Sequence, residues 1–410
     1  MERENALGVT DSDRDPHFEN EGWRHAGKAV SGGYFWYYAA VGVFFPFSAL
    51  YYRDLGFSGI EVGLLTALPS IGAAFVGPVL GAVADARSIH RPVLRVAIAL
   101  AALTALVASR VTAFSAIFAL IALVSIASAP IAPLLDSYAM TVSERLRRSY
   151  GSLRVWGSLG YMAFTLALGQ VMGDDVSSIV LVAYAATLGL VLVATIGLPA
   201  MREHHPRALV GGLGEIRRNR PLLLLLAVAF LLSSSSMLIN VYLGIHIEDL
   251  GGSTALIGAA FAISAASELP VIAFGGRLIA RFGPVRLIAI SLVVYTIRFA
   301  LLSLITAPVW ILPAQLLHGM SFAIYLIASV TLAYRLTGPA QAATAQALLT
   351  AMSFGFGAIT GSLVGGALLD AVGTEGLFRG GAVMMLVTLG VLLVGNRIVG
   401  LDRAASVRTT

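Results

Sequence analysis

The sequence predicts an all-α membrane protein with twelve transmembrane helices, arranged as two six-helix bundles with both termini in the cytoplasm. Of its 410 residues, 58% are apolar and only 12% are charged, whereas soluble domains carry about 25% charged residues. Because about 20 apolar residues cross one bilayer, and roughly 34 residues make a helix with its turn, the chain allows about twelve crossings. The composition excludes soluble enzymes and nucleic-acid-binding proteins. The absence of cysteine excludes disulfides, thiolate metal sites and iron–sulfur clusters.

The first half of the chain begins with residues 1–30, whose mixed charges lack the apolar core of a signal peptide. We interpret this segment as a disordered cytoplasmic tail. Residues 31–200 are predicted to form the N-terminal bundle, because they contain six apolar runs of membrane-spanning length. These runs are residues 33–52, 59–84, 92–109, 113–135, 150–172 and 176–199.

A polar, basic segment, residues 201–220, separates the two halves and is predicted to be a cytoplasmic linker. Residues 221–400 are predicted to form the C-terminal bundle, and residues 401–410 a cytoplasmic tail. The six apolar runs of this half are residues 221–247, 255–280, 285–305, 308–336, 340–369 and 376–399. With the amino terminus inside, 22 of the 27 Lys and Arg residues fall on the cytoplasmic side, which supports the even helix count. The compact loops favour a bacterial inner membrane as the location.

Two similar segments at the ends of the second and eighth predicted helices indicate an internal repeat. Residues 81–92 read GAVADARSIHRP and residues 275–286 read GGRLIARFGPVR, so both begin with glycine and are rich in arginine. Two six-helix halves joined by a basic linker are typical of rocking transporters, which bind substrate between the halves near the bilayer midplane.

The pattern Gly81-x-x-Ala-Asp85, followed by Arg91, resembles the cytoplasmic signature of the major facilitator superfamily, and Gly276 to Gly283 resembles its second copy. This resemblance implies the major facilitator fold and a cytoplasmic gate at these residues. Glycines let helix ends approach closely, and a carboxylate that faces a helix end or an arginine can hold a gate in one state. The alternative is a loop that only anchors charge at the cytoplasmic surface.

A narrower resemblance is carried by Asp136 and by YGSLRVWGSLGY, residues 150–161. These residues are similar to the phenylpropionate permease and lactose permease branch of proton symporters. The resemblance implies that Asp136 and Arg154 bind substrate and that Arg298 and His318 serve proton coupling.

The same comparison also shows departures from lactose permease. Ser321 stands where lactose permease has its proton-carrying glutamate, and Gln315 stands where it has a lysine. The seventh predicted helix offers Asn240 but none of the acids of lactose permease. The phenylpropionate permease branch therefore fits better, with Asn240, Gln315 and His318 as further substrate-binding candidates.

Glu268, Arg298 and His318 are predicted to lie near the middle of the bilayer. A charged residue at the centre of a spanning helix costs about 2.5 to 3.5 kcal/mol and usually faces a cavity or a partner. We therefore expect an ion pair between Arg298 and Glu268, with His318 nearby. Glu268 is our candidate proton carrier, because its protonation would depend on whether the arginine is engaged. The alternative is a purely structural ion pair within the C-terminal bundle.

Asp136 and Arg154 are predicted to be partners when no substrate is bound. By composition alone both lie near the cytoplasmic surface, where a gate salt bridge is the alternative; a longer fifth helix would place Arg154 deeper. Tyr38, Trp156 and Tyr161 are candidates to stack on a substrate ring, although helix packing would explain them nearly as well.

Motifs of zinc peptidases, nucleotide-binding loops and nucleophile elbows are missing from the sequence, so no enzyme activity and no cofactor is predicted. The expected function is proton-coupled symport of an aromatic acid, sugar or nucleoside by alternating access. Proton-driven efflux of amphiphiles is the alternative, and a non-transporting membrane receptor is the alternative of another class. The expected partners are a small-molecule substrate, protons and the lipid bilayer, with no nucleic acid, and we expect a monomer.

Overall fold

The N-terminal part of the computed structural model is a bundle of helices. The structure describes residues 16–173, 179–199, 218–339 and 341–406, and every regular element among them is a helix. The elements of the N-terminal bundle are α1 (Pro16–Asp54), α2 (Gly59–Ile71), the π-helical turn η1 (Gly72–Val76), α3 (Gly77–Arg87), α4 (His90–Ala108), α5 (Phe114–Ser128), α6 (Ile131–Leu146), α7 (Tyr150–Val171), α8 (Val180–Ala194) and the 3₁₀ turn η2 (Thr195–Gly197).

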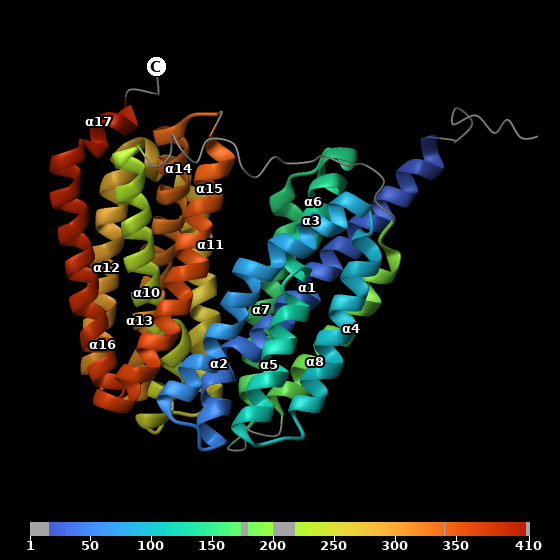
Figure 1. The fold of residues 1–410 in the computed structure, drawn as a ribbon, viewed down its shortest axis with the longest axis horizontal. Coiled ribbons are helices and arrows are strands. Elements are labelled where there is room, and N and C mark those ends of the chain that lie inside the picture. The colour runs from blue at the N-terminus through green and yellow to red at the C-terminus, as the bar shows by residue number, and fades with distance from the viewer. Residues whose placement is uncertain (1–15, 174–178, 200–217, 340, 407–410) are drawn as a thin grey trace, which may run out of the picture.

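The C-terminal part of the chain forms a second bundle, which stands beside the first (Figure 1). Its elements are α10 (Arg220–Asp249), α11 (Thr254–Phe282), α12 (Pro284–Leu304), the 3₁₀ turn η3 (Pro308–Trp310), α13 (Ile311–His318), the π-helical turn η4 (Gly319–Ala323), α14 (Ile324–Thr337), α15 (Ala342–Thr350), the π-helical turn η5 (Ala351–Gly357), α16 (Ala358–Val399) and α17 (Leu401–Ser406).

The helices have the apolar surfaces that a bilayer requires. Among the described residues, nine helical stretches are long and apolar enough to cross a membrane. Large apolar side chains such as Val171, Leu304 and Ile398 are 72%, 72% and 76% exposed, which suits contact with lipid tails rather than water. The stretch Ala342–Val399 contains a break at Gly373, where φ is 67°, so α16 consists of two helices.

The two bundles meet at one end of the molecule, which we call the closed end and which lies at the bottom of Figure 1. There α2 packs against α16, and α7 packs against α11. The contacts are backbone to backbone, because a Cβ atom on Gly366 would stand 2.2 Å from the Gly59 carbonyl oxygen, and one on Gly258 would stand 3.4 Å from the Gly169 Cα atom.

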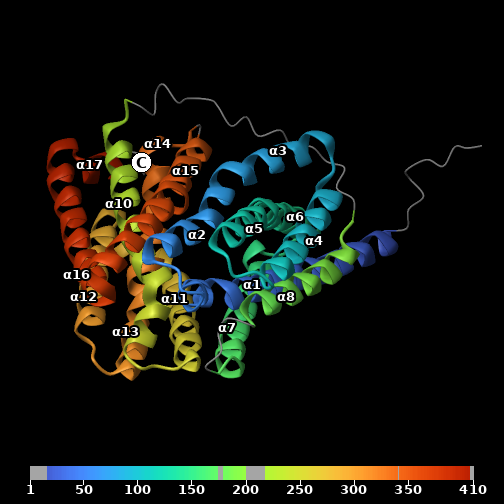
Figure 2. The same cartoon turned by 60° about the horizontal axis from the view of Figure 1, so that its bottom comes forward.

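Polar contacts reinforce the closed end. The carboxylate of Asp370 accepts hydrogen bonds from the backbone N–H groups of Gly59, at 2.6 Å, and Ile60, at 2.9 Å, at the start of α2. Arg53 forms an ion pair with Asp249 at 2.8 Å. The opposite end, which we call the splayed end, carries the α3–α4 and α11–α12 turns, and the two bundles diverge toward it (Figures 1 and 2).

The structure differs from the predicted tail over residues 16–30, because α1 begins at Pro16. This extension packs between its neighbours, with Ala26 and Val30 buried, and α1 runs beside α8 (Figure 2). Residues 1–15 and most of the predicted linker, residues 201–217, lie outside the described residues. The predicted C-terminal tail begins with the short helix α17.

Candidate functional site

A cavity of about 350 Å³ lies between the two bundles. It brings together four residues that the sequence singled out, namely Tyr38, Arg154, Tyr161 and Glu268. Its full lining is Tyr38, Val41 and Phe45 from α1, Arg154, Ser158 and Tyr161 from α7, and Phe261, Ser264, Ala265, Glu268, Leu269 and Ile272 from α11. The cavity therefore has an arginine on the wall of one bundle and a carboxylate on the wall of the other.

On the N-terminal wall, Arg154 stacks on aromatic rings. Its guanidinium carbon lies 3.9 Å from the ring centroid of Tyr38 and 5.5 Å from that of Tyr34. Gly157 makes this contact possible, because a Cβ atom there would stand 2.7 Å from Cδ2 of Tyr38 and 2.9 Å from Nη1 of Arg154. A guanidinium that lies flat on a ring keeps its N–H edge available for a bidentate ligand.

Asp136 lies behind this wall and does not pair with Arg154 as predicted. Its Oδ1 atom accepts hydrogen bonds from the hydroxyls of Tyr34, at 2.5 Å, and Tyr150, at 2.9 Å. Tyr34 thus stands between the two predicted partners, since its hydroxyl binds Asp136 while its ring faces Arg154. The sequence did not single out this tyrosine, because it lies in a run of aromatics that resembles an interfacial belt.

On the C-terminal wall, the three predicted midplane residues form a chain in a different order from the one expected. Nη1 of Arg298 donates to Nδ1 of His318 at 2.8 Å, and the Nε2–H of His318 donates to Oε1 of Glu268 at 3.0 Å. The expected direct pair of Arg298 and Glu268 is therefore wrong, because the imidazole stands between the two charges. Glu268 is the member that reaches the cavity, with a side chain that is 24% exposed, against 2% for Arg298.

Gln315 holds the buried arginine in place. Its Oε1 atom accepts hydrogen bonds from Nη2 of Arg298 and, at 3.0 Å, from the hydroxyl of Ser264. Ser264 lines the cavity, whereas Gln315 is fully buried behind it. Gln315 thus positions Arg298 from behind the cavity wall and does not itself face the cavity.

The backbone around Gly319 explains why His318 reaches Glu268. A Cβ atom on Gly319 would stand 2.0 Å from the carbonyl oxygen of Ser267, so the two helices touch at this glycine. The N–H group of Gly319 also donates to the Ser267 hydroxyl at 2.9 Å. The π-helical turn η4 begins at Gly319, and π-helical turns inside α-helices are frequent at functional sites.

Two other predicted substrate-binding residues do not line the cavity. Trp156 is 47% exposed and lines a separate pocket. It lies two residues from Arg154, or about 200° around the helix, and so faces away from the cavity. Asn240 on α10 is half-buried and is not part of the cavity lining.

The predicted gate residues lie at the splayed end on separate bundles. Asp85, near the end of α3, forms an ion pair with His90 at 2.6 Å, so this described contact stays within its own bundle. Arg91 is the second residue of α4. Gly81 and Gly276 have open space where a side chain would stand, and Gly283 ends α11 with a φ of 75°.

Known structures with a similar fold are transporters. The crystal structure of the nucleoside transporter NupG, in its D323A mutant, has a TM-score of 0.84 at 20% identity, and the match covers 90% of this chain and 99% of that one. An inward-facing bacterial homologue of the human lysosomal transporter Spinster has a TM-score of 0.66 at 11% identity, covering 95% and 98% of the two chains. These likenesses support the fold.

Relatives in sequence are also transporters. The chain is 31% identical over 347 residues to the maltose permease of Geobacillus stearothermophilus, which covers 82% of this chain and 86% of that protein. It is 24% identical over 378 residues to a probable 3-phenylpropionic acid transporter of Escherichia coli K12, covering 90% and 96%. Residues 28–380 match the MFS_1 like family. The predicted superfamily is confirmed: the chain belongs to the MFS_1 like family of the major facilitator superfamily and is a transporter of small solutes by its kinship.

Proposed function

We propose that this protein is a proton-coupled symporter of a small organic solute in a bacterial inner membrane, working by alternating access. The observation that carries the proposal is that Arg154 from one bundle and Glu268 from the other line the same cavity. A site that is shared between two halves can be opened to either side of the membrane when the halves rock against each other.

The cavity suits a solute with a flat or ring-shaped body and oxygen-rich edges. Tyr38, Tyr161 and Phe261 offer aromatic surfaces, and Arg154 offers N–H donors for a carboxylate or vicinal hydroxyls. The relatives and the structural neighbour are named for maltose, 3-phenylpropionic acid and nucleosides. We therefore infer that the substrate is a sugar, an aromatic acid or a nucleoside.

Glu268 is the proposed site of proton coupling. It is the cavity-facing end of a chain whose inner members, His318 and Arg298, are 8% and 2% exposed. Protonation of Glu268 would remove the only carboxylate from the described cavity lining and weaken its bond to His318. Substrate binding and proton binding would then take place in the same cavity, from its two opposite walls.

The proposed topology has twelve crossings with both termini in the cytoplasm. The nine candidate spans omit α1 and α7, and they count Ala342–Val399 as one stretch, although it breaks at Gly373. Adding these helices brings the number to twelve. The Lys and Arg distribution would place the splayed end in the cytoplasm, so the cavity would open inward and the closed end would face outward.

The test is transport by purified protein in proteoliposomes. Counterflow of labelled maltose, uridine and 3-phenylpropionate identifies the substrate class, and a pH-sensitive dye reports proton movement. Symport predicts that the external solution becomes alkaline when substrate is added outside. Acidification would instead indicate efflux by antiport, and binding without any counterflow would indicate a receptor.

The matched variants are Glu268→Gln and, as a control, Glu144→Gln, because Glu144 is an exposed acid near the end of α6. We expect Glu268→Gln to lose pH-driven accumulation but to keep counterflow, since exchange does not require the carrier to release its proton. The control keeps both activities. Full pH-driven accumulation by Glu268→Gln would refute the assignment of coupling to this residue.

A further inference from the structure

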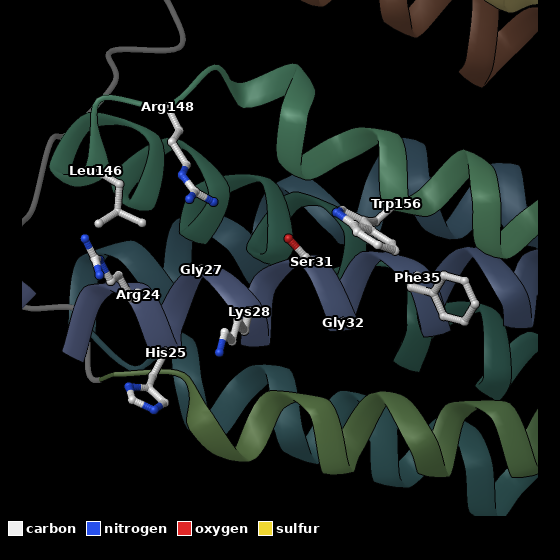
Figure 3. Close-up of a pocket in the computed structure, with 10 residues that line it drawn as sticks. All are labelled: Arg24, His25, Gly27, Lys28, Ser31, Gly32, Phe35, Leu146, Arg148 and Trp156. Atoms are coloured by element: carbon white, nitrogen blue, oxygen red, sulfur yellow. The ribbon is translucent and has the colours of Figure 1, made fainter. Parts of the chain in front are cut away.

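A second pocket lies on the N-terminal bundle, away from the cavity between the bundles. It has a volume of about 870 Å³ and is formed by α1, the end of α6 and the start of α7 (Figure 3). Its lining is Arg24, His25, Gly27, Lys28, Ser31, Gly32, Phe35, Leu146, Arg148 and Trp156. It shares no residue with the lining of the cavity.

One end of the pocket is strongly basic. Arg24, Lys28 and Arg148 are exposed, and His25 lies beside them (Figure 3). The ten residues of this described lining include no acid, and none of the ion pairs found among residues 22–173, 179–199, 218–339 and 341–404 involves these three cations. Three cations around one concave surface create a positive potential that attracts anions.

The other end of the pocket is apolar and aromatic. Phe35 lies inside the first apolar run, whereas Arg24 lies eleven residues before it on the same helix, or about 16 Å away along the axis. Trp156 and Phe35 lie at the end of the pocket opposite Arg24 and Leu146 (Figure 3), and half-exposed tryptophans are typical of the boundary between lipid tails and headgroups. The pocket therefore changes from charged to apolar along the direction in which α1 enters the membrane.

This polarity gradient matches a phospholipid better than a free anion or a soluble substrate. A phospholipid places an anionic phosphate in the headgroup layer and its acyl chains in the adjoining hydrocarbon, whereas inorganic phosphate would use only the basic end. Small residues on α1, namely Gly27, Ser31 and Gly32, leave room between the two ends. Trp156 and Arg154 lie on opposite faces of α7, so the pocket and the cavity lie on opposite sides of this helix.

We propose that this pocket binds an anionic phospholipid, with Arg24, Lys28 and Arg148 at its headgroup and Phe35 and Trp156 beside its acyl chains. The ligand would tie the start of α1 to the α6–α7 turn. Because α1 and α7 also supply Tyr38 and Arg154 to the cavity, the lipid would stabilise one wall of that cavity.

The test is native mass spectrometry of the purified full-length protein, titrated with phosphatidylglycerol or with phosphatidylethanolamine. The variant is the double substitution Arg24→Gln and Lys28→Gln. The matched control is Arg277→Gln with Arg281→Gln, which removes two exposed arginines from the same end of the C-terminal bundle. Since each cation near an anionic lipid is worth about fivefold in affinity, we expect the first pair to weaken phosphatidylglycerol binding about 10- to 30-fold.

The control pair is expected to leave phosphatidylglycerol affinity within about twofold of the wild type, and both double variants to unfold at the wild-type temperature in lipid-free detergent. Equal binding of the two lipids would overturn the proposal, as would an equal loss of affinity in the control. Displacement of the lipid by millimolar inorganic phosphate with the same stabilisation would show a small-anion site instead. Because binding is read directly, these outcomes do not depend on the transport function.

Discussion

Removing the carboxylate of Asp370 should open the closed end. In the structure this residue of α16 caps the start of α2 on the other bundle, so the bond exists only while the two bundles are together. The start of α2 keeps its own capping box, in which Ser58 and Glu61 bond to each other's backbone N–H groups. Asp370→Ala should therefore leave α2 folded and weaken only the contact between the bundles.

The magnitude follows from the two bonds that are lost. A carboxylate that accepts backbone N–H groups at a helix N-terminus contributes about 0.5 to 2 kcal/mol, and the lower half applies to an exposed residue such as Asp370. A loss of about 0.5 to 1.2 kcal/mol from one of two states changes their ratio about 2- to 8-fold, and because two bonds are lost we expect a change of about fivefold.

The assay uses the absence of cysteine from the chain. Val41→Cys introduces one thiol into the lining of the cavity, and a membrane-impermeant maleimide is added from the side of the closed end. Asp370→Ala should raise the labelling rate about fivefold. Glu375→Ala is the control, because Glu375 lies nearby but pairs with Arg379 on its own helix at 3.0 Å. An unchanged labelling rate in Asp370→Ala, or an equal rise in the control, would refute the role of Asp370 in holding the closed end together.

Three further substitutions probe the packing and the cavity. Gly160→Ala should destabilise the protein by about 1 to 3 kcal/mol, because the new Cβ atom would stand 2.0 Å from the Phe35 carbonyl oxygen. Gly390→Ala is the control, because a Cβ atom there meets nothing within 4 Å. Thermal unfolding in detergent compares the two variants. Arg154→Lys should weaken substrate binding about tenfold. Lysine keeps the positive charge but lacks the planar guanidinium, which stacks on aromatic rings and binds a ligand through two N–H groups. The substrate concentration at half-saturation in counterflow measures this change. Gln315→Leu should cost about 1.5 to 3 kcal/mol, because it leaves a buried guanidinium without one of its acceptors, again measured by thermal unfolding.

Each of these three expectations would be refuted by a specific result. Equal unfolding temperatures for the two glycine variants would show that α1 and α7 are less tightly packed than described. Wild-type half-saturation in Arg154→Lys would remove this residue from substrate binding. An unchanged unfolding temperature in Gln315→Leu would show that water or another group can satisfy Arg298.

The sequence was sufficient to find the charged residues that meet inside the C-terminal bundle. Glu268, Arg298 and His318 stand out because each interrupts an apolar run, and the structure brings all three together. Their order could not be deduced, because it depends on contacts between residues far apart in the chain. The approach of Gly319 to Ser267, 52 residues earlier, decides which partner His318 meets.

Other features of the site were missed for similar reasons. Tyr34 intervenes between Asp136 and Arg154 from a helix about a hundred residues earlier, and Asp370 meets Gly59 across 311 positions. No local sequence pattern predicts contacts between residues so far apart in the chain. The misplacement of Trp156 was avoidable, since residues two apart on a helix point to opposite sides.

The meeting of bare backbones at the closed end bears on the speed of transport. Where Gly59 touches Gly366 and Gly169 touches Gly258, these four residues have no side chain to order when the halves come together, so only neighbours such as Asp370 and Thr254 lose rotamer freedom there. Assembly and release at these points thus carry little entropic penalty in either direction. Such surfaces are suited to being made and unmade repeatedly.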